Sequence, residues 1–111
     1  MVQLISESLS ASSVARRLLY SYVNNTGKPV KAVFGGVKAL TNCSGNDAYL
    51  SICLDDVEQN RVPLKTGLYT IVPLELIVPT GSTLLIYTNW GGSSHSEVVW
   101  SLSGILNVYR C

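Results

Sequence analysis

The sequence predicts an all-β fold, an antiparallel β-sandwich of the jelly-roll type with an extended N-terminal arm. Three observations lead to this prediction. Short segments in which polar and apolar residues alternate recur along the chain, as they do in half-buried strands. Clusters of Gly, Pro, Asn and Ser separate these segments at intervals near the roughly 8–12 residues that are typical of sandwiches. No segment repeats its apolar residues with the period of about 3.6 residues that is typical of a helix. From the alternating segments and the turns between them we expect about eight short strands.

The first 13 residues are rich in serine but also contain Val2, Leu4 and Ile5. This stretch is too apolar for a free tail and too short for a layer of its own. We therefore expect residues 1–13 to form an extended arm that docks on a neighbouring sheet or on another subunit. Residues 14–111 then form one β-sandwich domain, because a chain of 111 residues can bury a single core without metals or disulfides.

Residues 15–23 predict a half-buried strand, because their apolar side chains alternate between two faces. These faces carry Leu18, Tyr20 and Tyr22 on one side and Leu19 and Val23 on the other. A helix over residues 13–19 is the competing local prediction. Residues 30–41 form the next predicted strand, which the pair Gly35 and Gly36 interrupts, and such a pair indicates a bulge or a sharp bend.

Residues 48–54 alternate cleanly and lead into the charged segment 55–61, which we predict to be a loop. Clustered oxygen ligands are what a hard cation such as Ca²⁺ prefers. The oxygen-bearing side chains of this segment are Asp55, Asp56, Glu58 and Asn60. Their spacing does not fit an EF-hand loop. A solvated acidic loop is the favoured interpretation, and we predict no metal site.

Residues 74–89 contain two apolar runs typical of β-strands, joined by the turn sequence PTGS. Pro79 suits the second position of a tight turn and Gly81 its last, so we predict that the two runs pair as the central hairpin of the domain. Residues 97–103 alternate as a further strand, after which Gly104 permits a bulge.

The composition combines 47% hydrophobic residues with 14% charged residues, whereas an ordinary soluble domain carries roughly 25% charged residues. No apolar run approaches the ~18 residues that span a bilayer. We therefore expect part of the apolar surface to contact other subunits in a closed homo-oligomer, with a trimer favoured. The alternative is that a loop or the arm covers these residues within one subunit. The expected interface residues are Leu19, Val23, Ile77, Leu85 and Tyr87.

Several functional classes are disfavoured. The net charge of +1 and the scattered cations give no surface for nucleic acid. Residues 1–13 lack the features of a signal peptide, so we expect synthesis in a cytosol and reduced Cys43, Cys53 and Cys111. The single His95 completes no zinc site and shares one loop with its neighbouring serines, which prevents a catalytic triad. We expect no enzyme activity and no cofactor.

The loop around Trp90 supports an alternative function. A loop tryptophan surrounded by Gly, Ser and Asn is typical of sugar-binding surfaces, where the indole stacks on a pyranose ring. The favoured interpretation is that Trp90 packs over the end of the sandwich or against a neighbouring subunit. The candidate residues for binding a cell-surface glycan are Tyr87, Asn89, Trp90 and His95.

The serine-rich arm, the segment VPTGSTLLIY and the later segment VVWSLSGILNVYR together resemble small virion proteins of tailed bacteriophages. These proteins include head decoration proteins and the sandwich modules of tail tips and fibres. The resemblance covers most of the chain and rests on its pattern. It implies a non-enzymatic structural protein of the virion, made in the host cytoplasm and bound to other virion proteins. We expect Val2, Leu4 and Ile5 of the arm to provide this attachment.

Overall fold

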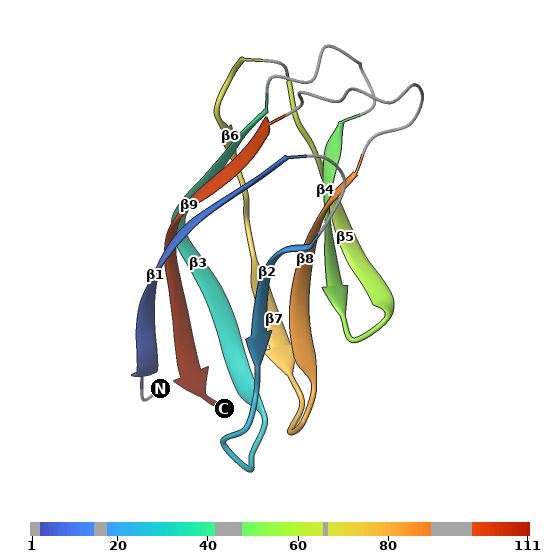
Figure 1. The fold of residues 1–111 in the computed structure, drawn as a ribbon. Coiled ribbons are helices and arrows are strands. Elements are labelled where there is room, and N and C mark those ends of the chain that lie inside the picture. The colour runs from blue at the N-terminus through green and yellow to red at the C-terminus, as the bar shows by residue number, and fades with distance from the viewer. Residues whose placement is uncertain (1–2, 15–17, 42–47, 66, 90–98) are drawn as a thin grey trace.

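The structure is a computed structural model that describes residues 3–14, 18–41, 48–65, 67–89 and 99–111. Within these residues the chain forms two antiparallel sheets that pack face to face (Figure 1). The predicted β-sandwich is therefore confirmed. The large sheet contains β1 (Gln3–Val14), β3 (Val30–Thr41), β6 (Thr70–Ile71), β7 (Glu75–Val78) and β9 (Val99–Arg110). The small sheet contains β2 (Leu18–Val23), β4 (Tyr49–Leu54), β5 (Val57–Pro63) and β8 (Thr83–Asn89).

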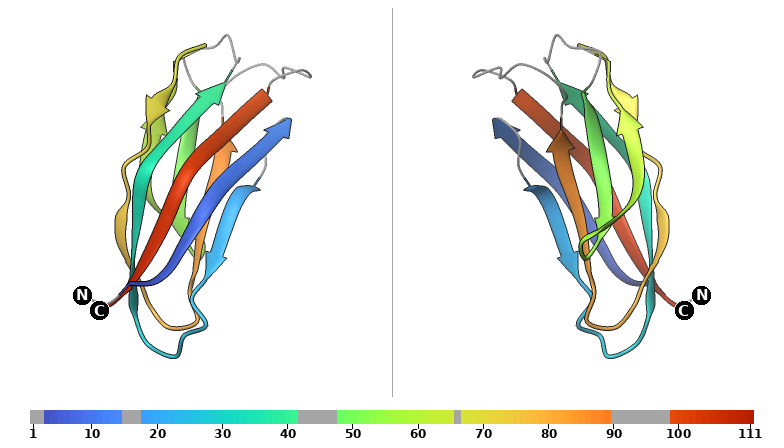
Figure 2. Two further views of the ribbon diagram at one scale, coloured as in Figure 1. Left: turned by 90° about the vertical axis from the view of Figure 1, so that its left-hand side faces the viewer. Right: turned by 90° about the vertical axis from the view of Figure 1, so that its right-hand side faces the viewer.

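The order of the strands is that of a jelly roll. The large sheet has the order β1-β9-β3-β6, with β7 also paired to β3, and the small sheet has the order β2-β8-β4-β5. First and last strands pair, as do β2 with β8, β3 with β6 and β7, and β4 with β5. A long hairpin that is rolled up into two sheets gives these pairs. Figure 2 shows the two layers from the side, with β1 and β2 next to each other.

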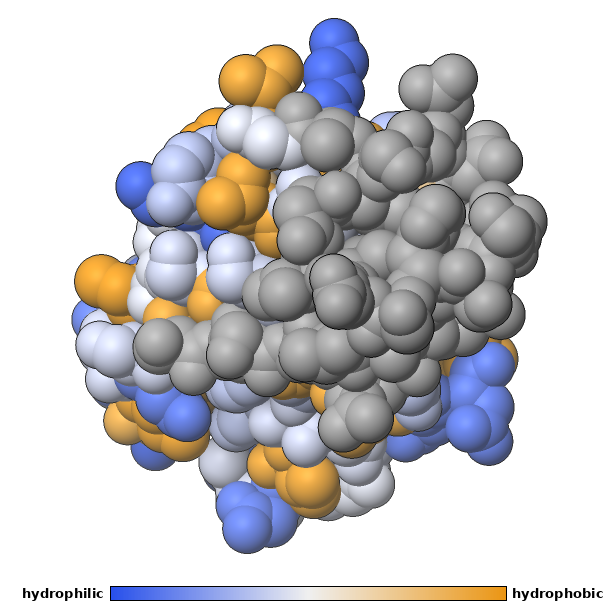
Figure 3. Space-filling view, turned by 45° about the horizontal axis from the view of Figure 1, so that its top comes forward, coloured by the Kyte–Doolittle hydropathy of each residue, from blue (hydrophilic) through white to orange (hydrophobic). Residues whose placement is uncertain are grey.

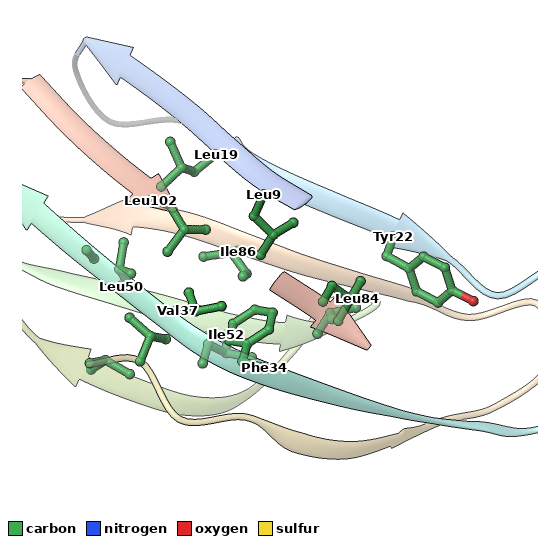
Figure 4. Packing of buried hydrophobic residues seen from close by; sticks show 14 of the residues in the cluster. Leu9, Leu19, Tyr22, Phe34, Val37, Leu50, Ile52, Leu84, Ile86 and Leu102 are labelled. Atoms are coloured by element: carbon green, nitrogen blue, oxygen red, sulfur yellow. The ribbon is translucent and has the colours of Figure 1, made fainter. Parts of the chain in front are cut away.

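The core lies between the inner faces of the two sheets, and side chains from both fill it (Figure 4). Strand alternation explains its composition, because every second residue of a strand points to the same face. The largest side chains that are almost fully buried are Leu50, Ile52, Leu84, Ile86, Trp100, Leu102 and Leu106. Each large side chain buried in this way contributes about 1.5–3 kcal/mol to stability.

A β-bulge in β3 confirms the prediction made from the glycine pair. Gly35 pairs with Ile105 and Lys38 pairs with Ser103, so two residues of β3 lie opposite one residue of β9. Gly36 has a φ of 61°, which glycine adopts without strain. The extra residue shifts by one position which side chains of β3 point inward. Phe34 before the bulge and Val37 after it therefore both point into the core.

Gly104 lies opposite this bulge in β9 and allows the two strands to approach. A Cβ atom at Gly104 would lie 2.5 Å from the Cα atom of Val37, and Gly104 has a φ of 148°. Both observations require glycine at this position. The bulge that we predicted at Gly104 of β9 is therefore in β3 instead. Gly104 itself lets β3 approach β9 closely.

The register of β2 corrects the predicted faces of this strand. A register shift against β8 falls between Leu18 and Tyr20. Leu18 therefore points to solvent and Leu19 is only 8% exposed, in the core beside Tyr22. Our expectation that Leu19 forms an oligomer interface conflicts with this burial, because its side chain is already packed within one subunit.

Residues 74–89 do not form the predicted hairpin. β7 pairs with β3 in the large sheet, whereas β8 pairs with β2 and β4 in the small sheet. The predicted tight turn exists, with the N–H of Ser82 donating to the carbonyl of Pro79 at 3.0 Å, and Gly81 has a φ of 79°. Pro79 is thus the first residue of the turn and not the second. The turn carries the chain from one sheet to the other.

The segment that we expected to be an arm is extended and forms β1. It pairs with β9 along most of its length, at the edge of the large sheet of its own chain. Leu9 is 3% exposed and belongs to the core, while Ile5 packs against the core. Leu4 is 36% exposed, and Val2 lies outside the described residues. An attachment role for this segment stays a prediction.

Candidate interaction surfaces

The outer face of the large sheet carries several exposed apolar side chains. Ile77 on β7 and Ile105 on β9 are 48% and 42% exposed, and Ile71 on β6 is 67% exposed. Tyr69, just before β6, is 63% exposed. We call these four residues the large-sheet patch. On the face of the molecule that Figure 3 draws, hydrophobic residues are scattered among pale and hydrophilic ones.

The charged side chains beside the large-sheet patch have partners within the subunit. Lys31 on β3 forms an ion pair with Glu75 on β7. The Nζ atom of Lys38 lies 4.8 Å from the centre of the Tyr69 ring, in a cation–π contact. A partner that covers this face would therefore meet one paired charge, Lys31 with Glu75, and one cation, Lys38, that rests on an aromatic ring.

The outer face of the small sheet brings together three of the predicted interface residues. Leu85 and Tyr87 on β8 point outward and are partly buried, and Val23 on β2 is 51% exposed. Leu18 pairs with Tyr87 and is 43% exposed. Ile77 lies on the large sheet instead. The predicted set is therefore divided between two opposite faces of the sandwich.

A polar cluster covers the other half of the small sheet. The Oγ atom of Ser51 donates to Oε1 of Glu58 at 2.6 Å, and Nε of Arg61 donates to both carboxylate oxygens of Glu58 at 2.9 and 3.0 Å. The guanidinium of Arg61 lies 4.7 Å from the centre of the Tyr49 ring. Hydrogen bonds from Ser51 and then Arg61 lower the pKa of Glu58. Through the bond from Ser51 to Glu58 the cluster joins β4 to β5.

The charged segment 55–61 differs from the predicted loop. Asp55 and Asp56 form a two-residue turn between β4 and β5, and the following residues belong to β5. Oδ1 of Asp55 accepts a hydrogen bond from the N–H of Thr83 at 2.9 Å. Asp55 and Glu58 therefore have partners within the chain, Glu58 through its ion pair with Arg61. Among the described residues there is no group of three His, Cys, Asp or Glu side chains that could hold a metal ion.

Asn24, which follows β2, organises one end of the sandwich and was missed by the sequence analysis. It is 0% exposed. Its Nδ2 atom donates to the carbonyls of Lys28 and Val78 at 2.8 and 2.9 Å. Its Oδ1 atom accepts from the N–H and the hydroxyl of Thr26 at 3.1 and 2.7 Å. Three of these four hydrogen bonds hold the loop between β2 and β3 in place, and the bond to Val78 ties this end of the sandwich to β7.

A pocket of about 420 Å³ lies beside this loop. Leu4 and Ile5 of β1 and Pro29 of the loop give it apolar walls, and Lys28 and Arg110 add two cations. Both cations are exposed, and neither has an ion-pair partner in the described part of the chain. The pocket is therefore apolar and positively charged. Two of the three predicted attachment residues line it.

The predicted glycan-binding residues are described only in part. Tyr87 is partly buried on the outer face of the small sheet, and Asn89 is the last residue of β8. Trp90 and His95 lie outside the described residues. The glycan hypothesis stays a prediction. Cys53 is buried in β4, Cys111 is exposed and both are free, whereas Cys43 lies outside the described residues.

Two general comparisons give no relatives. No protein-family model matches the sequence, and no curated protein matches it. In the described residues no helix is long and apolar enough to cross a membrane.

Solved structures with a similar fold come from infectious bursal disease virus. The chain is similar to VP2 of a subviral particle, with a TM-score of 0.57 and 17% sequence identity over 96% of this chain and 32% of that chain. The Gx strain structure gives a TM-score of 0.57 with 18% identity, over 96% of this chain and 32% of that chain. The Gt strain structure gives a TM-score of 0.54 with 20% identity, over 95% of this chain and 30% of that chain.

These similarities concern the fold, because the sequence identity is low. The chain spans about a third of the length of the chains that it matches (32% for VP2 of the subviral particle). The comparisons therefore support the predicted sandwich fold, which this chain shares with part of each of these viral chains. The structures compared above are not from tailed bacteriophages, so the finer resemblance stays a prediction.

Proposed function

We propose that this chain is a non-enzymatic structural module of a virus particle that associates with other copies of itself. The jelly-roll fold supports this proposal, because it matches part of VP2 in virus particles over almost the whole chain. The low fraction of charged residues, 14%, supports it as well. A trimer, a location in the virion and contacts with other virion proteins belong to the same proposal.

The observation that carries the proposal is the large-sheet patch, Tyr69, Ile71, Ile77 and Ile105. Four of the nine large hydrophobic side chains that are exposed among the described residues lie on or beside one broad face of a molecule with extents of 42 × 25 × 18 Å. A stable interface buries about 800 Å² on each partner, which a face of 42 × 25 Å can supply. Covering the patch would remove apolar surface from water, at about 25 cal/mol for each Å².

The proposal can be tested with paired surface variants. Ile77→Lys with Ile105→Lys places two charges in the large-sheet patch, and Leu18→Lys with Val23→Lys places two charges on the small sheet. All four positions are at least 42% exposed, so the monomer should fold in both variants. Circular dichroism and urea denaturation check this. Light scattering behind a sizing column then gives the mass of each protein.

We expect the large-sheet variant to have the mass of a monomer and the small-sheet variant to keep the mass of the wild-type assembly. The opposite result would place the interface on the small sheet, where Val23, Leu85 and Tyr87 lie. An assembly that survives both variants would contradict an interface on either apolar sheet face.

A further inference from the structure

The pocket beside the β2–β3 loop has a complement elsewhere on the same chain. The pocket combines apolar walls with Lys28 and Arg110. The turn between β4 and β5 combines Asp56 with Val57, which is 63% exposed. We call Asp56 and Val57 the hairpin tip. The pocket therefore suits an aliphatic side chain beside a carboxylate, and the hairpin tip presents such a pair at a protruding turn.

The charges of the two sites are available for an intermolecular contact. Among the described carboxylates, Glu58 binds Arg61, Glu75 binds Lys31, and Asp55 accepts from Thr83. These partners leave Asp56 and Glu7 without a hydrogen bond or ion pair in the described part of the chain. On the basic side, Lys28 and Arg110 have no ion-pair partner there.

The two sites cannot meet within one subunit. Figure 1 shows the β4–β5 turn on the right of the molecule and both chain ends at its lower left. Arg110 and Leu4, which line the pocket, are next to those ends. A contact between hairpin tip and pocket therefore joins two copies of the chain.

We propose that the pocket binds the hairpin tip of a second copy, with Val57 against Leu4, Ile5 and Pro29 and with Asp56 beside Lys28 and Arg110. Such a contact is head to tail, because the two partners contribute different surfaces. Repeated contacts of this kind close into a ring when the rotation between subunits allows it. The inference rests on the proposed function and adds a second contact to that of the large-sheet patch.

The test exchanges the charges of the two sites. Asp56→Lys makes a tip variant, Lys28→Glu with Arg110→Glu makes a pocket variant, and all three changes together make a swapped variant. Lys65→Glu is the control, because Lys65 is also exposed and without an ion-pair partner in the described residues. Circular dichroism confirms folding, and sedimentation velocity gives the dissociation constant of self-association.

We expect the tip variant and the pocket variant each to raise the dissociation constant about tenfold or more, because each places like charges together. The swapped variant and the control should keep the wild-type value. A mixture of the tip and pocket variants should associate more tightly than either alone, because each supplies one intact site. This gain on mixing is specific to a head-to-tail contact.

Two results would overturn the inference in different ways. Unchanged association in the tip and pocket variants, with loss of association in the large-sheet variant, would reject the contact and leave the proposed function in place. A wild-type protein that stays a monomer would reject both.

Discussion

At the scale of single residues, Asn24 shows how a buried polar side chain can stabilise a loop. Asn24 follows β2 and is 0% exposed. Its side chain bonds Thr26 and Lys28 in the β2–β3 loop and Val78 in β7. Its backbone also bonds the turn between β7 and β8, through Ser82 and Gly81 at 3.0 and 2.9 Å. The side chain of Asn24 therefore joins the β2–β3 loop to β7, and its backbone joins the end of β2 to the β7–β8 turn.

We predict that Asn24→Ala lowers the free energy of unfolding by about 2–4 kcal/mol, because buried partners lose their hydrogen bonds. Asn25→Ala is the matched control, since Asn25 is exposed, and should change the value by less than about 0.5 kcal/mol. Urea denaturation followed by circular dichroism measures both. Equal effects of the two changes would mean that the Asn24 hydrogen bonds do not hold this end of the sandwich.

Glu58 predicts a pH dependence of stability. Its pKa in the folded protein is lowered from 4.5, first by the hydrogen bond from Ser51 and then by that from Arg61. The unfolded chain therefore binds a proton more readily, and the stabilisation from Glu58 is present above about pH 4.5 and is lost as the pH falls through the folded pKa. Glu58→Gln should lower the urea midpoint at pH 7, and the difference from the wild type should shrink at pH 3.

Ser51→Ala provides the control for this pH dependence. It removes the first cause of the lowered pKa while the carboxylate stays in place. The pH dependence attributed to Glu58 should become smaller in this variant. A difference between wild type and Glu58→Gln that is the same at pH 7 and pH 3 would exclude the proposed cause.

At the scale of elements, β1 is part of the sandwich and its inward side chains contribute to the core. Leu9 is 3% exposed and lies opposite Gly104 of β9. We predict that Leu9→Ala lowers the free energy of unfolding by about 2–4 kcal/mol through the cavity that it leaves. Ser8→Ala, at an exposed position of the same strand, should be nearly neutral. A neutral Leu9→Ala would show that β1 does not pack here in solution.

The sequence predicts the local elements better than their partners. The glycine pair in β3 predicts the bulge correctly, because a bulge needs a backbone that only glycine adopts easily. The hairpin over residues 74–89 is wrong, because two apolar runs and a turn look alike whether the runs pair or cross between sheets. β7 pairs with β3, and β8 pairs with β2 and β4, all of which are distant in the sequence.

The candidate surfaces are also predicted better from local pattern than from the long-range topology. Alternation correctly places Val23, Leu85 and Tyr87 toward solvent. It cannot place Ile77 on the opposite face, because the sheet to which a strand belongs depends on the topology. The shift before Tyr20 that buries Leu19 has no glycine to mark it, and the pocket combines Leu4 with Arg110 from opposite ends of the chain.

At the scale of the whole molecule, the pairing of β1 with β9 joins the two ends of the chain and completes the jelly roll. Contacts between such distant segments form late and slowly, because closing a long loop costs entropy before the contacts form. The finished sandwich exposes an apolar face on the large sheet and complementary charges at the pocket and the hairpin tip. The proposed association of copies would give both surfaces a role and would stabilise the folded state by mass action.

The mass of the wild-type protein in solution tests the central claim most directly. One chain has a mass of 12.0 kDa. Light scattering behind a sizing column measures the mass over a roughly hundredfold range of concentration. We expect a defined multiple of the mass of one chain, a trimer, and we expect this assembly to dissociate on dilution. A mass of 12.0 kDa at every concentration would contradict self-association. The apolar faces would then have no role in joining copies of this chain.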